Sequence, residues 1–152
     1  MKTDPLQKAK EYSFLLLKYR LRSEKEIYVR LKQKKFPEEI IKEALSFLKA
    51  KKFLDDELFA RAWADSRLKR SLGLRKIKEE LRQKGISKET IEFCLARLKQ
   101  GYCEEGIVEE LARQRFEKLK GIEPKKAKSR VYAYLLRRGF SPETIIDTVN
   151  QL

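Results

Sequence analysis

The stretch that decides the fold is LDDELFARAWADSRL, residues 54–68. Its carboxylates at Asp55 and Asp56 suit a helix start, where they meet unpaired backbone N–H groups and the positive end of the helix dipole. Apolar side chains then recur at helical spacing and predict one buried stripe. The stripe consists of Leu58, Phe59, Ala62, Trp63 and Ser66. We therefore expect a helix that begins at the aspartates.

Two further helical patterns complete this block. The run LRKIKEEL, residues 74–81, follows Gly73, and its pattern stops near Gly85. Glycine suits the left-handed conformation that often ends a helix. A third pattern begins at Ser87. The block therefore predicts a unit of three helices.

The same unit occurs on both sides of this block. A shift of 50 residues aligns Leu31 with Leu81, and a shift of 54 aligns Gly85 with Gly139. Lys35 stands where the other copies have glycine. We expect the first copy to end its second helix differently, or with strain, because a side chain disfavours the left-handed conformation.

Local signals mark the helices of the first copy. Asp4 followed by Pro5 fits a helix start, and Ser23 with Glu26 three positions later fits a capping box. Sustained alternation of apolar and polar residues, the mark of a strand, is absent. The chain is therefore predicted to be all-α, with about nine helices.

The repeat period of about fifty residues indicates a tandem array. A unit of this size has little core of its own, so neighbouring units are expected to stabilise one another. The predicted fold is all-α, with three tandem three-helix repeats that form an elongated, curved helical array. The predicted repeats are residues 1–52, 53–102 and 103–152.

Charge is the main compositional signal. Charged residues make up 39% of the 152 residues, and 37 Lys and Arg against 23 Asp and Glu give a net charge of +14. Such an excess predicts attraction to polyanions: nucleic acid, an anionic membrane surface or an acidic protein. Residues 1–52 contribute +8, residues 53–102 contribute +4 and residues 103–152 contribute +2. A solvated helical surface without such a partner is the alternative.

Residues for catalysis are missing from the sequence. The chain has no histidine, and its two cysteines, Cys94 and Cys103, cannot complete a zinc site. Asp55 and Asp56 diverge at a helix start and are interpreted as caps, because no third ligand is placed beside them. No phosphate loop or nucleophile motif occurs. We expect no catalytic residue, no metal and no cofactor.

Targeting signals are also missing. The N-terminal residues Met1-Lys2-Thr3-Asp4-Pro5 lack the apolar core of a signal peptide. The longest aliphatic run, residues 14–17, is far too short to span a bilayer. We expect a cytoplasmic protein.

A basic stripe accompanies the second helix of the middle block. Arg75, Lys78 and Arg82 lie about a quarter-turn from its apolar face. Cations held beside a buried face suit phosphate binding, which releases condensed counterions. A solvated face with pairs such as Lys76 and Glu80 is the alternative.

At this point the motifs resemble those of the bacterial RecX regulatory proteins. The resemblance rests on LDD at 54–56, RKI at 75–77, ELRQKGI at 80–86 and RRGFS at 137–141. It covers nearly the whole chain, in the order and spacing of the family. Lys35 in the first repeat departs from the glycine of the other copies.

The resemblance implies a monomeric, non-enzymatic modulator of the RecA recombinase in homologous recombination, DNA repair and the SOS response. Such a protein would bind the RecA filament on single-stranded DNA, with double-stranded DNA as a second candidate, and would restrain its ATPase, strand exchange and assembly. The alternatives are a generic basic helical DNA-binding protein without a recombinase partner, and a helical scaffold for acidic proteins. The candidate binding residues are Arg20, Arg22, Arg30, Lys32, Arg67, Lys69, Arg70, Arg75, Lys78, Arg82, Arg137 and Arg138.

Overall fold

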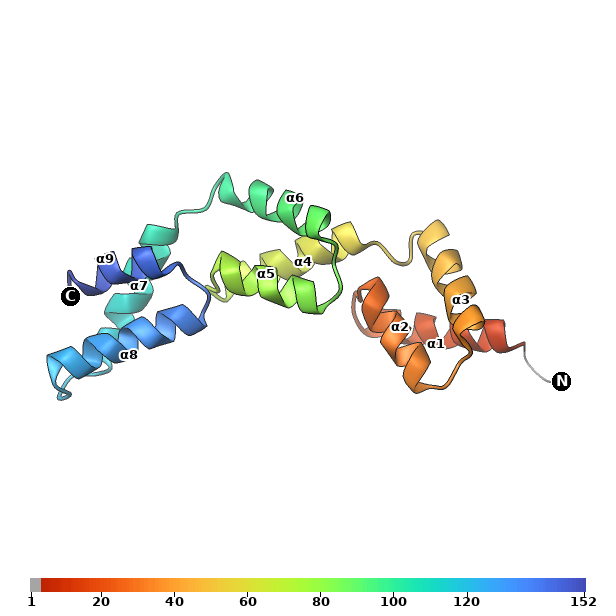
Figure 1. Ribbon diagram of the computed structural model, residues 1–152, viewed down its shortest axis with the longest axis horizontal. Coiled ribbons are helices and arrows are strands. Elements are labelled where there is room, and N and C mark those ends of the chain that lie inside the picture. Colours follow the sequence, from red (N-terminus) through yellow and green to blue (C-terminus); the bar gives the residue numbers. More distant parts are fainter. Residues whose placement is uncertain (1–3) are drawn as a thin grey trace. The chain divides into compact units, whose positions relative to one another are not determined.

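The computed structural model describes residues 4–152, which form nine α-helices and no strand. Figure 1 shows these helices along the chain. The all-α prediction is confirmed. Met1, Lys2 and Thr3, which belong to the N-terminal stretch considered above, lie outside the described residues. The helices are α1 (Pro5–Tyr19), α2 (Glu24–Gln33), α3 (Glu38–Ala50), α4 (Asp56–Lys69), α5 (Leu74–Gln83), α6 (Lys88–Lys99), α7 (Glu104–Glu117), α8 (Pro124–Arg137) and α9 (Pro142–Val149).

The chain forms two compact units whose limits cut through the middle three helices. The first unit comprises residues 4–63 and 81–91, and the second comprises residues 64–80 and 92–152. Each unit therefore holds one whole group of three helices together with parts of α4, α5 and α6. No helix within residues 4–152 is long and apolar enough to cross a membrane.

In the first unit, α1, α2 and α3 pack against one another around an aliphatic core. The helix starts use the predicted caps. The Leu6 N–H donates to Asp4 Oδ1 at 3.2 Å. Ser23 and Glu26 form a complete capping box, which fixes the start of α2. The buried core side chains are Ala9, Leu16, Ile27, Leu31, Ile41, Ala44, Leu45, Leu48 and Leu54.

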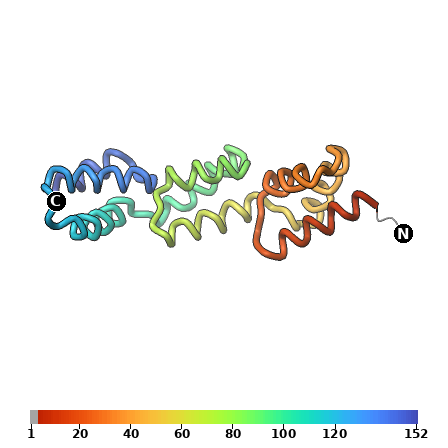
Figure 2. Tube along the Cα trace, turned by 90° about the horizontal axis from the view of Figure 1, so that it is seen from below, coloured from red at the N-terminus to blue at the C-terminus, as the bar shows by residue number. Residues whose placement is uncertain are grey.

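In the second unit, α7, α8 and α9 lie against one another, as Figure 1 and Figure 2 both show. Pro124 and Pro142 each occupy the first position of their helix, where the missing N–H costs nothing. The core has the same aliphatic character with one large ring, Phe140. Its buried side chains are Val108, Ala112, Val131, Leu135, Phe140, Ile145 and Val149.

The predicted stripe of α4 is wrong in part. Phe59 is buried as expected, and its ring stacks on Trp63 with centroids 5.7 Å apart. However, Leu58 is 48% exposed. Ala60 and Ala64 are buried in place of Ala62 and Ser66. The buried face is rotated toward the two alanines, because small side chains allow close packing that a count of large apolar residues does not anticipate.

The turns after α2, α5 and α8 share one backbone conformation. Gly85 and Gly139 have φ angles of 80° and 93°, as predicted for left-handed helix ends. Lys35 has a φ angle of 66°, so the first copy ends its second helix in the same way. Of the two expectations for Lys35, the strained ending is the one observed.

Replacing Lys35 with glycine is expected to raise the free energy of unfolding by about 1 kcal/mol, because glycine adopts the left-handed conformation without strain. Lys34, with φ at −79°, is the matched control. Lys34→Gly should lower the free energy of unfolding by about 0.5–1 kcal/mol, since it only adds chain entropy. Urea denaturation followed by circular dichroism measures both. Equal effects of the two substitutions would show that Lys35 is not strained.

Candidate functional site

The start of α2 contacts the end of α5 in the first unit. Ser23 Oγ donates to the Lys84 carbonyl at 2.7 Å, and Lys25 Nζ donates to the Gln83 carbonyl at 3.2 Å. Glycine at position 85 permits this approach, because a Cβ there would lie 2.5 Å from the Lys25 Cβ. Residues about sixty positions apart thereby form one surface.

Asp56 also belongs to this contact. Its Oδ1 accepts the Glu24 N–H at 2.9 Å, so it caps α2 rather than its own helix. Burial raises the pKa of the Asp56 carboxyl, although the hydrogen bond from Glu24 acts in the opposite direction. Asp55 Oδ1 accepts the N–H groups of Glu57 and Leu58 at 3.0 and 3.2 Å. The predicted cap of α4 is therefore Asp55 alone.

A groove of about 300 Å³ lies along this contact. Its lining carries four cations and one carboxylate. Of the predicted binding residues, Arg22 and Arg30 line it. The lining residues are Arg22, Lys25, Glu26, Val29, Arg30, Gln83 and Lys84.

Other candidate cations of the first unit have intramolecular partners. Arg20 pairs with Glu26, and Lys32 Nζ lies 2.9 Å from Glu38 Oε2. The hydrogen bond and the charge of Glu38 raise the pKa of the Lys32 ammonium. Arg82 is exposed near the end of α5. Exposed pairs of this kind are weak, so Lys32 can exchange Glu38 for another anion.

The second unit contains a similar contact between the start of α5 and the end of α8. The Gly73 N–H donates to the Arg138 carbonyl at 2.7 Å, and the Arg75 N–H donates to the Gly139 carbonyl at 3.2 Å. A Cβ on Gly73 would lie 2.2 Å from the Gly139 carbonyl oxygen. Glycine is required at both positions because the two backbones touch.

Two of the predicted binding residues have intramolecular partners within the second unit. The Arg138 guanidinium donates to the carbonyls of Ser71 and Arg70. Arg67 pairs with Glu80 at 2.9 Å, and both side chains are largely buried. These two arginines hold the fold together where the sequence suggests a free surface. Exposed candidates in this unit are Lys69, Arg70, Arg75, Lys78 and Arg137.

Sequence reasoning missed Lys25 and Lys84. Lys25 stands between Arg22 and Arg30 in the most basic third of the sequence, and this local charge is the signal that could have found it. Lys84 has no such signal, because its neighbourhood depends on a contact between distant segments. Its Nζ lies 3.1 Å from Glu26 Oε2 and 4.9 Å from the centre of the Trp63 ring.

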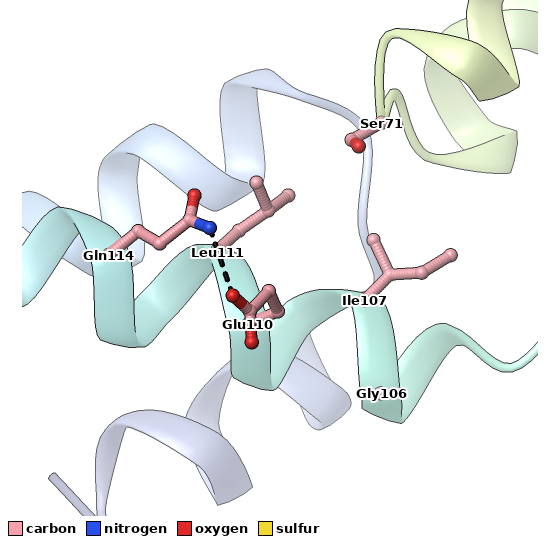
Figure 3. A pocket seen from close by; sticks show the side chains of 6 residues that line it. All are labelled: Ser71, Gly106, Ile107, Glu110, Leu111 and Gln114. Atoms are coloured by element: carbon pink, nitrogen blue, oxygen red, sulfur yellow. Dashed lines mark hydrogen bonds between the residues drawn. The ribbon is translucent and has the colours of Figure 1, made fainter.

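A hollow of about 330 Å³ in the second unit has a different character (Figure 3). Ile107 and Leu111 line it with Glu110, whose Oε1 accepts a hydrogen bond from Gln114 Nε2 at 2.9 Å. No cation lines it, so it does not suit a phosphate. Within residues 4–152, no group of three potential metal ligands is present.

Tyr102, just before α7, has a strongly perturbed hydroxyl. Burial, together with the Glu104 carboxylate, raises the pKa of Tyr102 to about 12, although the Leu74 backbone N–H acts in the opposite direction. We expect an ultraviolet titration of the folded protein to contain a tyrosine step near pH 12 that belongs to Tyr102. Because its pKa is raised on folding, its contribution to stability is complete below about pH 10 and is lost as the pH rises toward 12.

Tyr102→Phe should remove this step from the titration. If the folded wild-type protein showed no tyrosine step near pH 12, the burial argument for Tyr102 would be wrong.

These features define an all-α tandem repeat protein with a cationic surface. Comparison with protein families then identifies it. Models described as the first, second and third three-helix domains of RecX match residues 9–48, 55–95 and 104–148. The chain belongs to the RecX family, as its motifs indicate, and the prediction of three tandem three-helix repeats is confirmed.

Individual relatives agree with the family match. The chain is 33% identical to "Regulatory protein RecX" of Haemophilus influenzae (strain PittGG), over 92% of this chain and 91% of the relative. It is 35% identical to the protein of that name from Chlorobium phaeobacteroides (strain BS1), over 96% and 94%. The crystal structure of RecX from Lactobacillus salivarius has the same fold, with a TM-score of 0.80, 24% identity and coverage of 97% and 96%.

Proposed function

We propose that this protein binds RecA recombinase filaments on single-stranded DNA and inhibits their ATPase, strand exchange and assembly. Membership of a family of regulatory proteins is the observation that carries the proposal. It acts in the cytoplasm as a monomer, without catalysis and without a cofactor. This role places it in homologous recombination, DNA repair and the SOS response.

The cationic side chains support this proposal. Arg75, Lys78 and Arg82 are exposed on α5, and Arg30 is exposed on α2. Exposed cations attract the protein to the phosphates within the filament. The repeats then bridge neighbouring recombinase subunits, and this bridging biases the filament away from its ATP-cycling geometry.

Binding to preassembled filaments tests the proposal. Filaments formed with a non-hydrolysable ATP analogue on an immobilised oligonucleotide are incubated with this protein and excess bare single-stranded DNA. We expect the protein to remain on the filaments. Transfer to the bare DNA would favour the alternative, a basic helical DNA-binding protein without a recombinase partner. Retention on neither would favour a scaffold for acidic proteins.

A further inference from the structure

The groove between α2 and the end of α5 carries more positive charge than the one carboxylate in its lining can balance. This carboxylate, Glu26, already accepts hydrogen bonds from neighbouring groups. It accepts hydrogen bonds from Arg20, from the Ser23 N–H at 3.1 Å and from Lys84 Nζ at 3.1 Å. Burial acts to raise the pKa of Glu26, but these hydrogen bonds outweigh it and hold the pKa below the usual range. Glu26 therefore stays ionised and is shared by Lys84 and Arg20, whose two positive charges it offsets only in part.

The other three cations of the groove form no ion pair with a carboxylate of residues 4–152. Arg22 Nε and Lys25 Nζ donate to the carbonyls of Leu16 and Gln83 at 3.3 and 3.2 Å, and neutral carbonyls do not cancel charge. Arg30 is exposed and has no ion pair with any of residues 4–152. Burial, together with the positive charges of Arg20 and Arg30, lowers the pKa of the Arg22 guanidinium, although the charge of Glu26 acts in the opposite direction. A bound anion would relieve this repulsion.

The groove suits a nucleic-acid backbone better than a free anion. Val29 contributes an apolar side chain that is 39% exposed, which can contact a sugar or the edge of a base. A guanidinium fork binds two oxygens of one phosphate, and an ammonium group adds a point charge beside it. A volume of about 300 Å³ accommodates a phosphate with its sugar.

We propose that this groove binds a phosphodiester of single-stranded DNA, with Arg30 and Lys25 donating to the phosphate oxygens and Val29 contacting the adjoining sugar. The inference rests on the proposed function, in which that strand is the DNA of the filament. It assigns the DNA contact to the first repeat and the end of α5.

The site is composite, because its lining residues come from two segments, the region of α2 and the end of α5. Lys25 approaches the phosphate while its Nζ is held by the Gln83 carbonyl, and Ser23 Oγ holds the Lys84 carbonyl. DNA binding therefore stabilises the contact between α2 and the end of α5.

The test is the binding of a fluorescent oligothymidylate to the full chain without recombinase, measured by anisotropy over a range of salt concentrations. Arg30→Glu is compared with Arg61→Glu, an exposed arginine of α4 that does not line the groove. The two variants have the same net charge. Arg30→Glu should weaken binding at least about tenfold and reduce the salt slope by about 0.7 for each phosphate that the protein no longer neutralises. Arg61→Glu should weaken binding by less than about threefold, through long-range attraction alone.

Equal losses in the two variants, or unchanged binding by Arg30→Glu, would overturn the groove assignment. Displacement of the oligonucleotide by inorganic phosphate at constant ionic strength would also overturn it, since it would indicate a free-anion site. Circular dichroism verifies that both variants fold.

The proposal of a recombinase partner can fail independently of the groove assignment. If the wild-type protein does not bind filaments while Arg30→Glu loses oligonucleotide binding, only the recombinase proposal fails. If wild-type protein binds filaments while Arg30→Glu keeps oligonucleotide binding, only the groove assignment fails.

Discussion

Gly139→Ala is expected to lower the free energy of unfolding by about 3 kcal/mol or more. Two costs combine in this substitution. The φ angle of 93° disfavours any side chain, at about 1–2 kcal/mol. In addition, the new Cβ would lie 2.5 Å from the Lys76 backbone nitrogen, and crowding of this kind costs about 1–3 kcal/mol. Backbone cannot move aside as a flexible side chain can. Denaturant unfolding followed by circular dichroism measures the loss.

Alanine substitutions at three other glycines measure the cost of positive φ and the cost of crowding separately. Gly121 has φ at 92° with nothing within 4 Å of a new Cβ, so Gly121→Ala should cost about 1–2 kcal/mol. In Gly73→Ala the Cβ would meet the Gly139 carbonyl oxygen without positive φ, so crowding alone should destabilise the protein. Gly101→Ala, with neither feature, should be near neutral. If Gly139→Ala cost no more than Gly121→Ala, the backbone contact between α5 and α8 would not exist in solution.

Reversing the charge of Arg75, Lys78 and Arg82 together to glutamate is expected to raise the concentration needed for half-inhibition of recombinase ATPase at least about tenfold, or about 1.4 kcal/mol. All three side chains are exposed on α5, so the substitutions leave the buried face of the helix intact. Reversal replaces attraction to the filament by repulsion, which affects association most strongly at low salt.

A matched triple variant keeps the net charge equal. Lys118, Lys125 and Lys126 are exposed in the second unit, outside the candidate surface. Their replacement by glutamate should change half-inhibition by less than about threefold, through screened long-range attraction. Similar losses in both variants would mean that overall charge, rather than the face of α5, directs the protein to its target.

Local signals in the sequence were sufficient for the helices and their ends. The capping box of Ser23 and the left-handed glycines Gly85 and Gly139 depend on residues within a few positions, and the structure contains all of them. The buried face of α4 was less predictable, because Ala60 and Ala64 are buried while the larger Leu58 is exposed. Packing of small residues depends on the neighbouring helix.

The candidate site was predictable only in part, for the same reason. Exposure of Arg30 and Arg75 follows from helical phase. The hydrogen bonds from Arg138 to the carbonyls of Ser71 and Arg70 could not be predicted in this way, because those carbonyls lie almost seventy positions earlier in the chain. The groove likewise depends on Lys84 meeting α2. Whether these cations bind DNA or recombinase stays a prediction.

The most direct test of the central claim is the single-stranded-DNA-dependent ATPase rate of the cognate recombinase, titrated with substoichiometric amounts of this protein in the presence of excess unrelated DNA. A regulator of the filament should inhibit the ATPase at ratios well below one protein per recombinase subunit, and the competitor DNA should not relieve the inhibition. Inhibition that the competitor abolishes, or that requires enough protein to saturate the DNA, would contradict the account and show that the protein only masks DNA.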